Sequence, residues 1–468
     1  MKKSLLFLIL FLPLSGIAQQ WTKVDAGSEY TLALKSDGTL WAWGFNGNGQ
    51  LGLGSTVAQS SPTQIGTATD WQDLAAGSFH ALAVKTDGTL WSWGLNGQGQ
   101  LGLGTMTQET SPTQVGTATN WKSVEAGFIH SFAIKTDNSL WSWGWNMFGQ
   151  LGLGITSDIN TPTQVGTDTD WQSVTAGGVH SAAIKTSGTL WAWGSNGNGQ
   201  LGNGTTNDAT SPQQIGNLSN WEMVSAGFEY CLALQDDKSV WSWGFNGNSQ
   251  LGDDGLGAQQ TSPVNFDVSK DWKAVEAGAS FGFAIKDDGR LFGWGSNLQG
   301  QLGTGSTSQE DNPVQVGMET DWDFISAADG ALVNNSLFGQ HTLGLKIARN
   351  AMCGTGANYQ GQVGNGTTSA LSTFSCSIGI LNVGRVSNSL EKVIEIFPNP
   401  SSGFISIQSQ ESLTNYTLTI FSLSGKKVRE LPIEHKNNID LSDITSGVYL
   451  LTIEGSHGEV KRQKLILD

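Results

Sequence analysis

Cysteine, positive charge and long apolar stretches are all scarce in this sequence. Its 468 residues include three cysteines, Cys231, Cys353 and Cys376, which are too few for a framework of disulfides. Lysine and arginine number 24 against 40 acidic residues, so the formal net charge is −16. A nucleic-acid binder needs a basic surface that displaces counterions from phosphates, and we therefore expect no DNA or RNA partner. After residue 18, no apolar stretch is long enough to cross a bilayer.

Helical periodicity is also missing, and a repeated unit of about fifty residues is found instead. Its opening tryptophans mark seven copies, at Trp21, Trp71, Trp121, Trp171, Trp221, Trp272 and Trp322. A constant period of this size indicates a repeat architecture. The 62 glycines follow the same period, which excludes a collagen-like chain. The 19 tryptophans and 19 phenylalanines can bury a large core, which argues against disorder.

Each copy carries the signals of short antiparallel strands. In the second copy, the apolar runs 80–85 and 89–93 flank the pair Asp87-Gly88. An Asp-Gly pair between such runs predicts a tight hairpin, because both residues tolerate positive φ. Two further short strands bring each copy to about four strands. Four strands per copy, repeated radially, predict an all-β fold, a seven-bladed β-propeller over residues 19–384.

The fixed letters of the unit form a specific motif. They read Ala-Gly-x-x-His, then Lys-x-Asp-Gly-x-Leu-Trp-x-Trp-Gly-x-Asn-x-x-Gly-Gln-Leu-Gly. This motif resembles the repeats of the regulator of chromosome condensation family, whose members form seven-bladed propellers. The resemblance implies the same fold here. It does not carry over the nucleotide-exchange role of the family's namesake, because a fold does not transmit a function.

The ends of the repeated region depart from the pattern. The first copy lacks the Ser-Pro-Thr-Gln-Val segment that precedes its siblings, while residues 372–378 follow the last copy in that segment's place. We therefore predict that this late strand completes a blade begun at the N-terminus, so that the ring has no open edge. The seventh copy also has about ten extra residues between Trp322 and His341. Cys353 and Cys376 belong to this copy, and the sequence leaves open whether they pair.

Both termini predict export. Residues 1–18 have the charged start, apolar middle and small residues of a secretory signal peptide. Residues 385–468 contain strand-length runs separated by glycines and predict a small immunoglobulin-like β-sandwich. The Phe-Pro-Asn-Pro segment at 397–400 and the basic segment at 461–464 resemble the type A sorting domain of the type IX secretion system. The resemblance implies that the type IX machinery is a partner and that the protein is secreted or displayed on the outer-membrane surface.

No motif in the repeats supports catalysis. His80, His130 and His180 share one blade position, but the equivalent residues in other copies include Tyr30, Tyr230 and Phe281, and positions spread around a ring do not converge on a metal ion. The glycine-rich loops open no helix, so they are not phosphate cradles. The tryptophan pairs favour packing between blades over sugar stacking, and the lysines at hairpin ends are expected to form weak solvated ion pairs. We expect a protein that is not an enzyme and that binds no metal and no cofactor.

Two loops per copy vary while their frames stay fixed. One precedes the His/Tyr position, and the other follows Trp-Gly. Large apolar residues at variable tips are poor candidates for packing, and on one face they would form a partner site. The candidate partner-binding residues are Phe45, Phe79, Leu95, Phe128, Ile129, Trp145, Met147, Phe148, Phe228 and Phe245.

These residues support two functional hypotheses. The first is a non-catalytic scaffold that binds a macromolecule, expected to be a protein, and it predicts an aromatic cluster on one flat face. The alternative is a protein that binds or cleaves carbohydrate, and it predicts an acidic pair or exposed aromatics in the central channel. The variable tips are also compatible with packing against neighbouring blades. An exported chain is not expected to meet a small GTPase.

Overall fold

The computed structural model describes residues 20–378 except 329, 331, 334–335, 338 and 348–349, and, further on, 394–397, 404–409, 416–422, 427–433, 438–454 and 460–467. The predicted signal peptide lies outside these residues. The chain divides into two compact units, residues 1–379 and 380–468. The predicted boundary after residue 384 falls in a stretch that the structure does not describe. Within the described residues no helix is long and apolar enough to cross a membrane.

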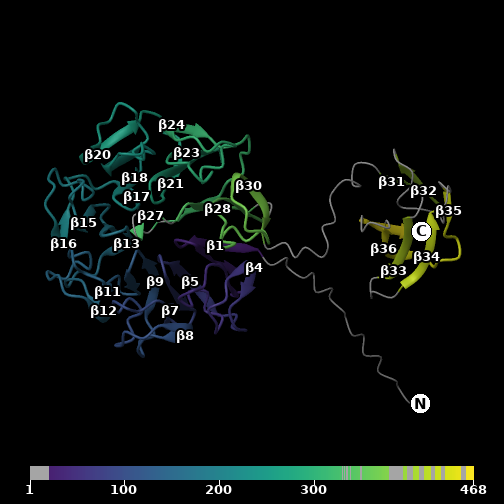
Figure 1. Cartoon of the computed structure of the whole chain (residues 1–468), viewed down its shortest axis with the longest axis horizontal. Coiled ribbons are helices and arrows are strands. Elements are labelled where there is room, and N and C mark those ends of the chain that lie inside the picture. Colours follow the sequence, from purple (N-terminus) through teal and green to yellow (C-terminus); the bar gives the residue numbers. More distant parts are fainter. Residues whose placement is uncertain are drawn as a thin grey trace, which may run out of the picture. The chain divides into compact units, whose positions relative to one another are not determined.

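The first unit is a ring of seven four-stranded antiparallel sheets, which are the seven predicted blades (Figure 1). The first strands of the blades are β1 (Trp21–Ala26), β5 (Trp71–Ala76), β9 (Trp121–Ala126), β13 (Trp171–Ala176), β17 (Trp221–Ala226), β21 (Trp272–Ala277) and β25 (Phe324–Ala327). The second strands are β2 (Tyr30–Lys35), β6 (His80–Lys85), β10 (His130–Lys135), β14 (His180–Lys185), β18 (Tyr230–Gln235), β22 (Phe281–Lys286) and β28 (His341–Lys346). The third strands are β3 (Leu40–Gly44), β7 (Leu90–Gly94), β11 (Leu140–Gly144), β15 (Leu190–Gly194), β19 (Val240–Phe245), β23 (Leu291–Gly295) and β29 (Ala351–Gly356). The fourth strands are β4 (Gln59–Gln64), β8 (Glu109–Gln114), β12 (Ile159–Gln164), β16 (Ala209–Gln214), β20 (Gln259–Asp267), β24 (Glu310–Gln315) and β30 (Leu371–Ile378).

The Asp-Gly hairpins form where they were predicted, with a different turn. Only the second residue takes a positive φ, as at Gly88 (φ 77°), while Asp87 is not among the residues with positive φ. The Asp87 carboxylate instead accepts hydrogen bonds from the backbone N and the Oγ1 of Thr89, at 2.9 and 2.7 Å. A three-residue loop that ends in one left-handed residue explains this geometry better than a turn with two.

The second tryptophan of each Trp-x-Trp strand joins neighbouring blades. Trp193 is fully buried, and its indole Nε1 donates to the backbone O of Gln150 in the preceding copy at 2.8 Å. A Cβ on Gly152 would lie 2.9 Å from the same Nε1, so the Gly-Gln-Leu-Gly loop can approach the indole only because it has glycine there. The residues that recur in the copies, in Trp-x-Trp and Gly-Gln-Leu-Gly, therefore form the contact between blades.

The predicted closure of the ring by a shared strand is wrong. β30 completes its own blade beside β29, and β1 pairs with β2, so every blade is made of one contiguous copy. The first and last blades instead meet through side chains. Trp43 Nε1 and Thr31 Oγ1 both donate to the backbone O of Gln362, each at 2.9 Å. Because these are the same contacts that join the inner blades, the ring closes without a strand that crosses the gap.

The seventh blade accommodates the extra residues as a small hairpin. β26 (Leu332–Val333) pairs with β27 (Ser336–Leu337) between β25 and β28. Just before this hairpin, the backbone O of Gly330 accepts a hydrogen bond from Ser78 Oγ of the second blade at 3.4 Å. In the same blade Cys353 and Cys376 form a disulfide that links β29 to β30. The sequence had left this pairing open.

The second unit consists of two small sheets. One has the strand order β31 (Ile394–Phe397), β32 (Phe404–Ser409) and β35 (Asn438–Asp440). The other has the order β34 (Lys427–Ile433), β33 (Tyr416–Ser422), β36 (Gly447–Glu454) and β37 (Val460–Leu467). Ile405 and Ile407 of the first sheet share one core with Leu418, Ile420 and Leu451 of the second. Two antiparallel sheets over a common core agree with the predicted β-sandwich.

Candidate partner-binding face

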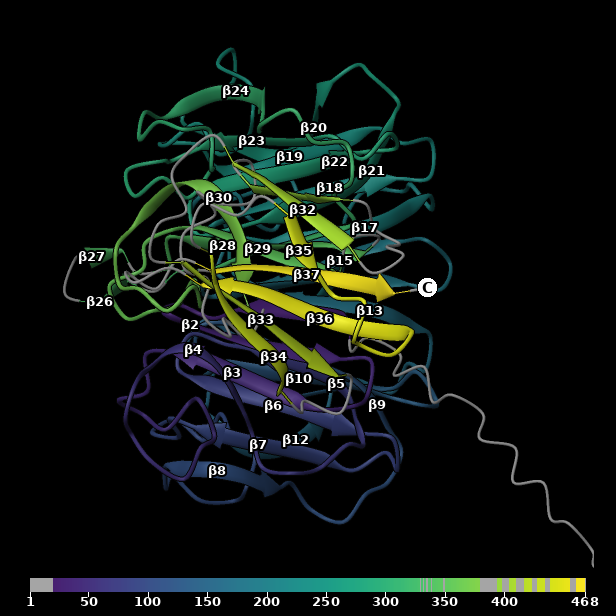
Figure 2. The ribbon, with the colours of Figure 1, turned by 90° about the vertical axis from the view of Figure 1, so that its right-hand side faces the viewer.

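One flat face of the ring collects both variable loops of every blade. Since the four strands of a blade are antiparallel, the connection from the first strand to the second and that from the third to the fourth leave the sheet at the same end. We call this side the loop face, and the opposite side, which holds the Asp-Gly hairpins, the hairpin face. Figure 2 views the ring from its edge, with the hairpin β26–β27 projecting from the loop face.

Five of the ten candidate residues form a continuous aromatic cluster on the loop face. Phe128 is its centre, because its ring centroid lies 6.4 Å from that of Phe79, 6.2 Å from that of Trp145 and 6.2 Å from that of Phe228. Phe148 extends the cluster, with its centroid 5.8 Å from that of Trp145. These rings come from the second, third and fifth blades, so a cluster forms from residues up to 149 positions apart (228 − 79).

Phe228 reaches the cluster by crossing the fourth blade. A Cβ on Gly178 would lie 2.7 Å from Phe228 Cδ2, so only glycine leaves room for the ring to pass. Phe228 is 9% exposed and is the most buried ring of the cluster. Phe79, Phe128, Trp145 and Phe148 are half-buried and present part of their rings to solvent.

The other five candidates lie on the same face outside this cluster. Met147 is 62% exposed at the tip of its loop, and Leu95 and Ile129 are half-buried. Phe45 and Phe245 are also half-buried and fold against their own loops, because a Cβ on Gly47 or Gly247 would lie 2.4 or 2.3 Å from the neighbouring ring. The tucked arrangement considered for the variable tips therefore describes Phe45 and Phe245, but not the five clustered rings.

The central channel is the second candidate site. It contains a cavity of about 290 Å³ lined by the first strands of the blades. Polar side chains four positions after the first tryptophan of a copy accept hydrogen bonds from the next blade. The bonds run from Ala76 N to Asp25 (2.8 Å), Ala226 N to Thr175 (3.1 Å), Ala277 N to Ser225 (2.9 Å), Ala327 N to Glu276 (3.4 Å) and Ala26 N to Ser326 (3.0 Å). They link the blades around the axis.

Three carboxyl groups of this channel are affected by burial. Desolvation raises the pKa of Asp25, raises that of Glu125 well above its usual value, and raises that of Glu276 to about 8. Asp25 and Glu276 belong to the ring of hydrogen bonds, whereas Glu125 makes none within the described residues. The only basic side chain among the cavity's lining residues is Lys23, which pairs with Asp73 at 2.5 Å. The alternative hypothesis predicted such acidic residues, and the structure places them in the channel.

Comparison with protein families decides the identity of both units. Residues 11–280 match the RCC1-like domain, and residues 272–301 and 288–331 match the regulator of chromosome condensation (RCC1) repeat. The chain belongs to the RCC1-like domain family. Residues 395–468 match the secretion system C-terminal sorting domain. The C-terminal unit is thus a type IX sorting domain, which directs the protein to the cell surface or outside the cell.

Known structures support the RCC1-like fold and nothing finer. Human WBSCR16 superimposes with a TM-score of 0.64 at 21% identity, covering 72% of this chain and 93% of that one. The Saccharomyces cerevisiae protein Prp20p superimposes with a TM-score of 0.61 at 18% identity, covering 84% and 94%. The ultraviolet-B receptor UVR8 of Arabidopsis thaliana is 43% identical over 44 residues, which are 9% of this chain and 10% of the receptor. The aligned part therefore spans only a tenth of that relative's length.

The fold, the family and the export of the RCC1-like propeller agree with the predictions, but the lysines that recur at its hairpin ends make different contacts from those predicted. We expected solvated ion pairs of small worth. Lys185 instead lies with its Nζ 4.7 Å from the ring centroids of both Trp171 and Trp191, and 2.6 Å from Asp168 Oδ2. The same lysine–tryptophan contact recurs at Lys35, Lys85, Lys135, Lys286 and Lys346. A cation between aromatic faces contributes more than an exposed pair.

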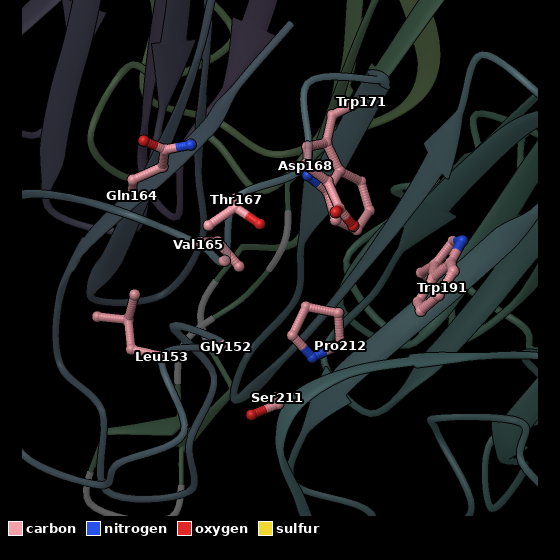
Figure 3. Close-up of a pocket in the computed structure, with 11 residues that line it drawn as sticks. Gly152, Leu153, Gln164, Val165, Thr167, Asp168, Trp171, Trp191, Ser211 and Pro212 are labelled. Atoms are coloured by element: carbon pink, nitrogen blue, oxygen red, sulfur yellow. The ribbon is translucent and has the colours of Figure 1, made fainter.

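These contacts also bear on the sugar-stacking hypothesis. Trp171, Trp191 and Asp168 border a pocket of about 350 Å³ between the third and fourth blades, shown in Figure 3. Because Lys185 already lies against both indole rings, their faces are engaged within the protein. In the Trp-x-Trp strand of this blade, Trp191 is thus a structural residue that holds the hairpin end, and Trp193 is buried between blades.

The channel carboxyl groups make stability depend on pH. A pKa near 8 for Glu276 in the folded state, against about 4.3 in the unfolded state, means that folding favours the protonated form. This stabilisation is complete below pH ~4 and is lost as pH rises toward and through 8. We expect Glu276→Gln to raise the free energy of unfolding at pH 9, where the native glutamate is ionised, and to change it little at pH 4. Because Glu276 is partly exposed, solvent screens its charge and we expect a gain of only roughly 2 kcal/mol.

Urea unfolding of the two proteins at pH 4 and pH 9 measures this difference. The control is Glu222→Gln, which removes an exposed carboxylate that pairs with Lys238 on the surface. An exposed pair contributes little, so the control should follow the wild type at both pH values. Equal pH dependence in Glu276→Gln and the wild type would show that this carboxyl group titrates normally.

Proposed function

We propose that the loop face binds a protein partner outside the cell and that the propeller performs no chemistry of its own. The observation that carries the proposal is the aromatic cluster of Phe79, Phe128, Trp145, Phe148 and Phe228. Interfaces concentrate their binding energy in a few aromatic residues that are surrounded by weaker contacts. These rings lie in loops that vary from copy to copy, while the fixed residues of the repeat already fill the contacts between blades. The cluster is therefore available for recognition.

The sorting domain implies contact with the type IX machinery, which we assign to the second unit. We propose no nucleic-acid or small-GTPase partner for the propeller. One solved structure of Prp20p is described together with binding to Gsp1p and histones, but that likeness, at 18% identity, extends to the fold alone. Type IX secretion moves this chain to the cell surface or outside the cell, where we expect it to meet no small GTPase.

Truncation of the cluster is expected to weaken capture of the partner. The mature chain would first be used to retain a protein from culture medium and cell-surface fractions, and the retained protein would be identified and purified. Trp145→Ala and Phe148→Ala should each weaken its binding about tenfold or more, because each removes a ring from the cluster. The affinity of the purified pair measures the effect.

Met318→Ala is the matched control, since this side chain is 93% exposed on a connection between blades at the hairpin face. It should bind like the wild type. Unchanged affinity in both aromatic variants would contradict the proposed site. Retention of polysaccharide with no protein would contradict the proposed function.

Carbohydrate binding in the channel is the second candidate. It is favoured by Glu125, a carboxyl group that lines the cavity and makes no hydrogen bond within the described residues. Binding of oligosaccharides that is lost in Glu125→Gln and retained in Trp145→Ala would support this candidate over the loop face.

A further inference from the structure

The two faces of the RCC1-like propeller differ in where basic side chains lie. The sequence places no lysine or arginine in any of the fourteen connections that make up the loop face. The basic residues that the structure describes in this unit lie instead in the strands, in the hairpins, or in the connections between blades. They are Lys23, Lys35, Lys85, Lys122, Lys135, Lys185, Lys238, Lys270, Lys273, Lys286, Arg290 and Lys346. A cation that approaches the loop face therefore meets no basic side chain in its loops.

Two acidic residues on this face are joined to aromatic residues through their backbone. Glu229 follows Phe228 of the cluster, and its backbone O accepts a hydrogen bond from Phe245 N at 2.9 Å. Glu29 occupies the equivalent position in the first blade, where Phe45 N donates to its backbone O at 2.8 Å. Both side chains are half-buried, and neither has an ion pair or a side-chain hydrogen bond within the described residues. Burial raises the pKa of each carboxyl group, as expected where no cation compensates it.

The hairpin face shows how this chain satisfies such groups when it has a cation. There Lys185 lies between two tryptophans and contacts Asp168 and Asp170, at 2.6 and 3.0 Å. Carboxylate, aromatic ring and ammonium form one unit. The loop face has the carboxylates and the rings, and its loops supply no cation. Arginine and lysine are the side chains that complete this set, since they pair with carboxylates and stack on aromatic rings.

We propose that the loop face recognises a basic polypeptide segment, whose arginine or lysine side chains pair with Glu29 and Glu229 and lie against the cluster around Phe128 and Trp145. The inference rests on the proposed function and specifies the chemistry of the partner. Aliphatic stems of the same side chains would cover the exposed parts of the rings. Neutral glycans and acidic segments lack the group that the two carboxylates require.

Synthetic peptides test this chemistry directly. Three fluorescent sixteen-residue probes would be titrated with the mature chain, with arginine, glutamate or serine alternating with leucine. We expect the arginine probe to bind at least tenfold more tightly than the other two. We also expect Glu29→Gln/Glu229→Gln and Trp145→Ala each to weaken that binding about tenfold, since each removes one half of the proposed contact.

The control keeps the net charge of the carboxylate variant and moves the change to the other face. Asp236→Asn/Asp287→Asn removes two exposed carboxylates near the hairpins. It should bind the arginine probe like the wild type. An equal loss in this control would show attraction to the acidic chain as a whole and would overturn the site. Equal binding of the three probes would overturn the preference for a basic segment.

The same variants separate this inference from the proposed function. If Trp145→Ala abolishes binding of the purified natural partner while Glu29→Gln/Glu229→Gln leaves it intact, the loop face is an interface but its partner is not held by basic side chains. If neither variant affects the natural partner, the proposed function itself fails.

Discussion

Replacement of Trp43 by alanine is expected to destabilise the protein by about 3–5 kcal/mol. The indole is fully buried, and it donates across the junction between the first and last blades to the backbone O of Gln362. A Cβ on Gly364 of the last blade would lie 2.5 Å from the same Nε1. The substitution removes this packing and one of the two side-chain donors to this carbonyl, leaving only Thr31 Oγ1. The free energy of unfolding in urea measures the loss.

Trp193→Ala provides the comparison within the ring, because Trp193 makes the equivalent bond to Gln150 O. If closure depends on these side-chain contacts, the two variants should lose similar stability. A cost below about 1 kcal/mol for Trp43 beside a full cost for Trp193 would mean that the junction contributes little. The ring would then be held by the other six junctions.

Loss of the disulfide is expected to cost about 3 kcal/mol. Cys353 and Cys376 are 23 positions apart, and a crosslink over a loop of this size restricts the unfolded chain by roughly that amount. The bond holds the outermost strand of the seventh blade, β30, which among the strands that the structure describes pairs with β29 alone. Cys353→Ser/Cys376→Ser should therefore unfold at lower urea concentration than the wild type, and addition of a reductant should affect the wild type alone.

Cys231→Ser is a matched control. This buried thiol lies 3.2 Å from His180 Nε2, and burial raises its pKa well above the usual value. Neighbouring blades have Ser131 and Ser181 at the same position, where His80 and His130 contact their hydroxyls at 2.8 and 3.2 Å. Serine should thus replace Cys231 with little change in stability. If a reductant still lowers the stability of Cys353→Ser/Cys376→Ser, the effect of reduction does not come from this disulfide.

The sequence alone was sufficient for the fold because its signals are local and repeated. Trp-x-Trp-Gly, Asp-Gly and Gly-Gln-Leu-Gly each fix a few residues, and seven copies in register leave little choice of architecture. The closure was mispredicted because the first copy has no Ser-Pro-Thr-Gln-Val segment before it. That absence predicts a first blade that lacks a strand, which residues 372–378 would supply. The structure shows that residues 371–378 serve their own blade.

The site was only partly accessible from sequence. Variation between copies pointed to the ten loop residues, but it could not tell which of them meet. That depends on Gly178, whose missing side chain lets Phe228 pass over a blade to Phe128. The channel carboxyl groups were missed because Asp25, Glu125 and Glu276 share their strand position with Thr175 and Ser225, so no motif sets them apart.

Blades made of whole copies also bear on how such a chain changes over generations. The duplicated stretch of sequence and the independently hydrogen-bonded sheet are the same unit here. A copy can therefore be exchanged for another without cutting any sheet. Such an exchange replaces both loops of the copy on the loop face at once. The tryptophan and the glutamine that bond to the neighbouring blades are the same in the new copy. Recognition can diversify in this architecture blade by blade, at little risk to the ring.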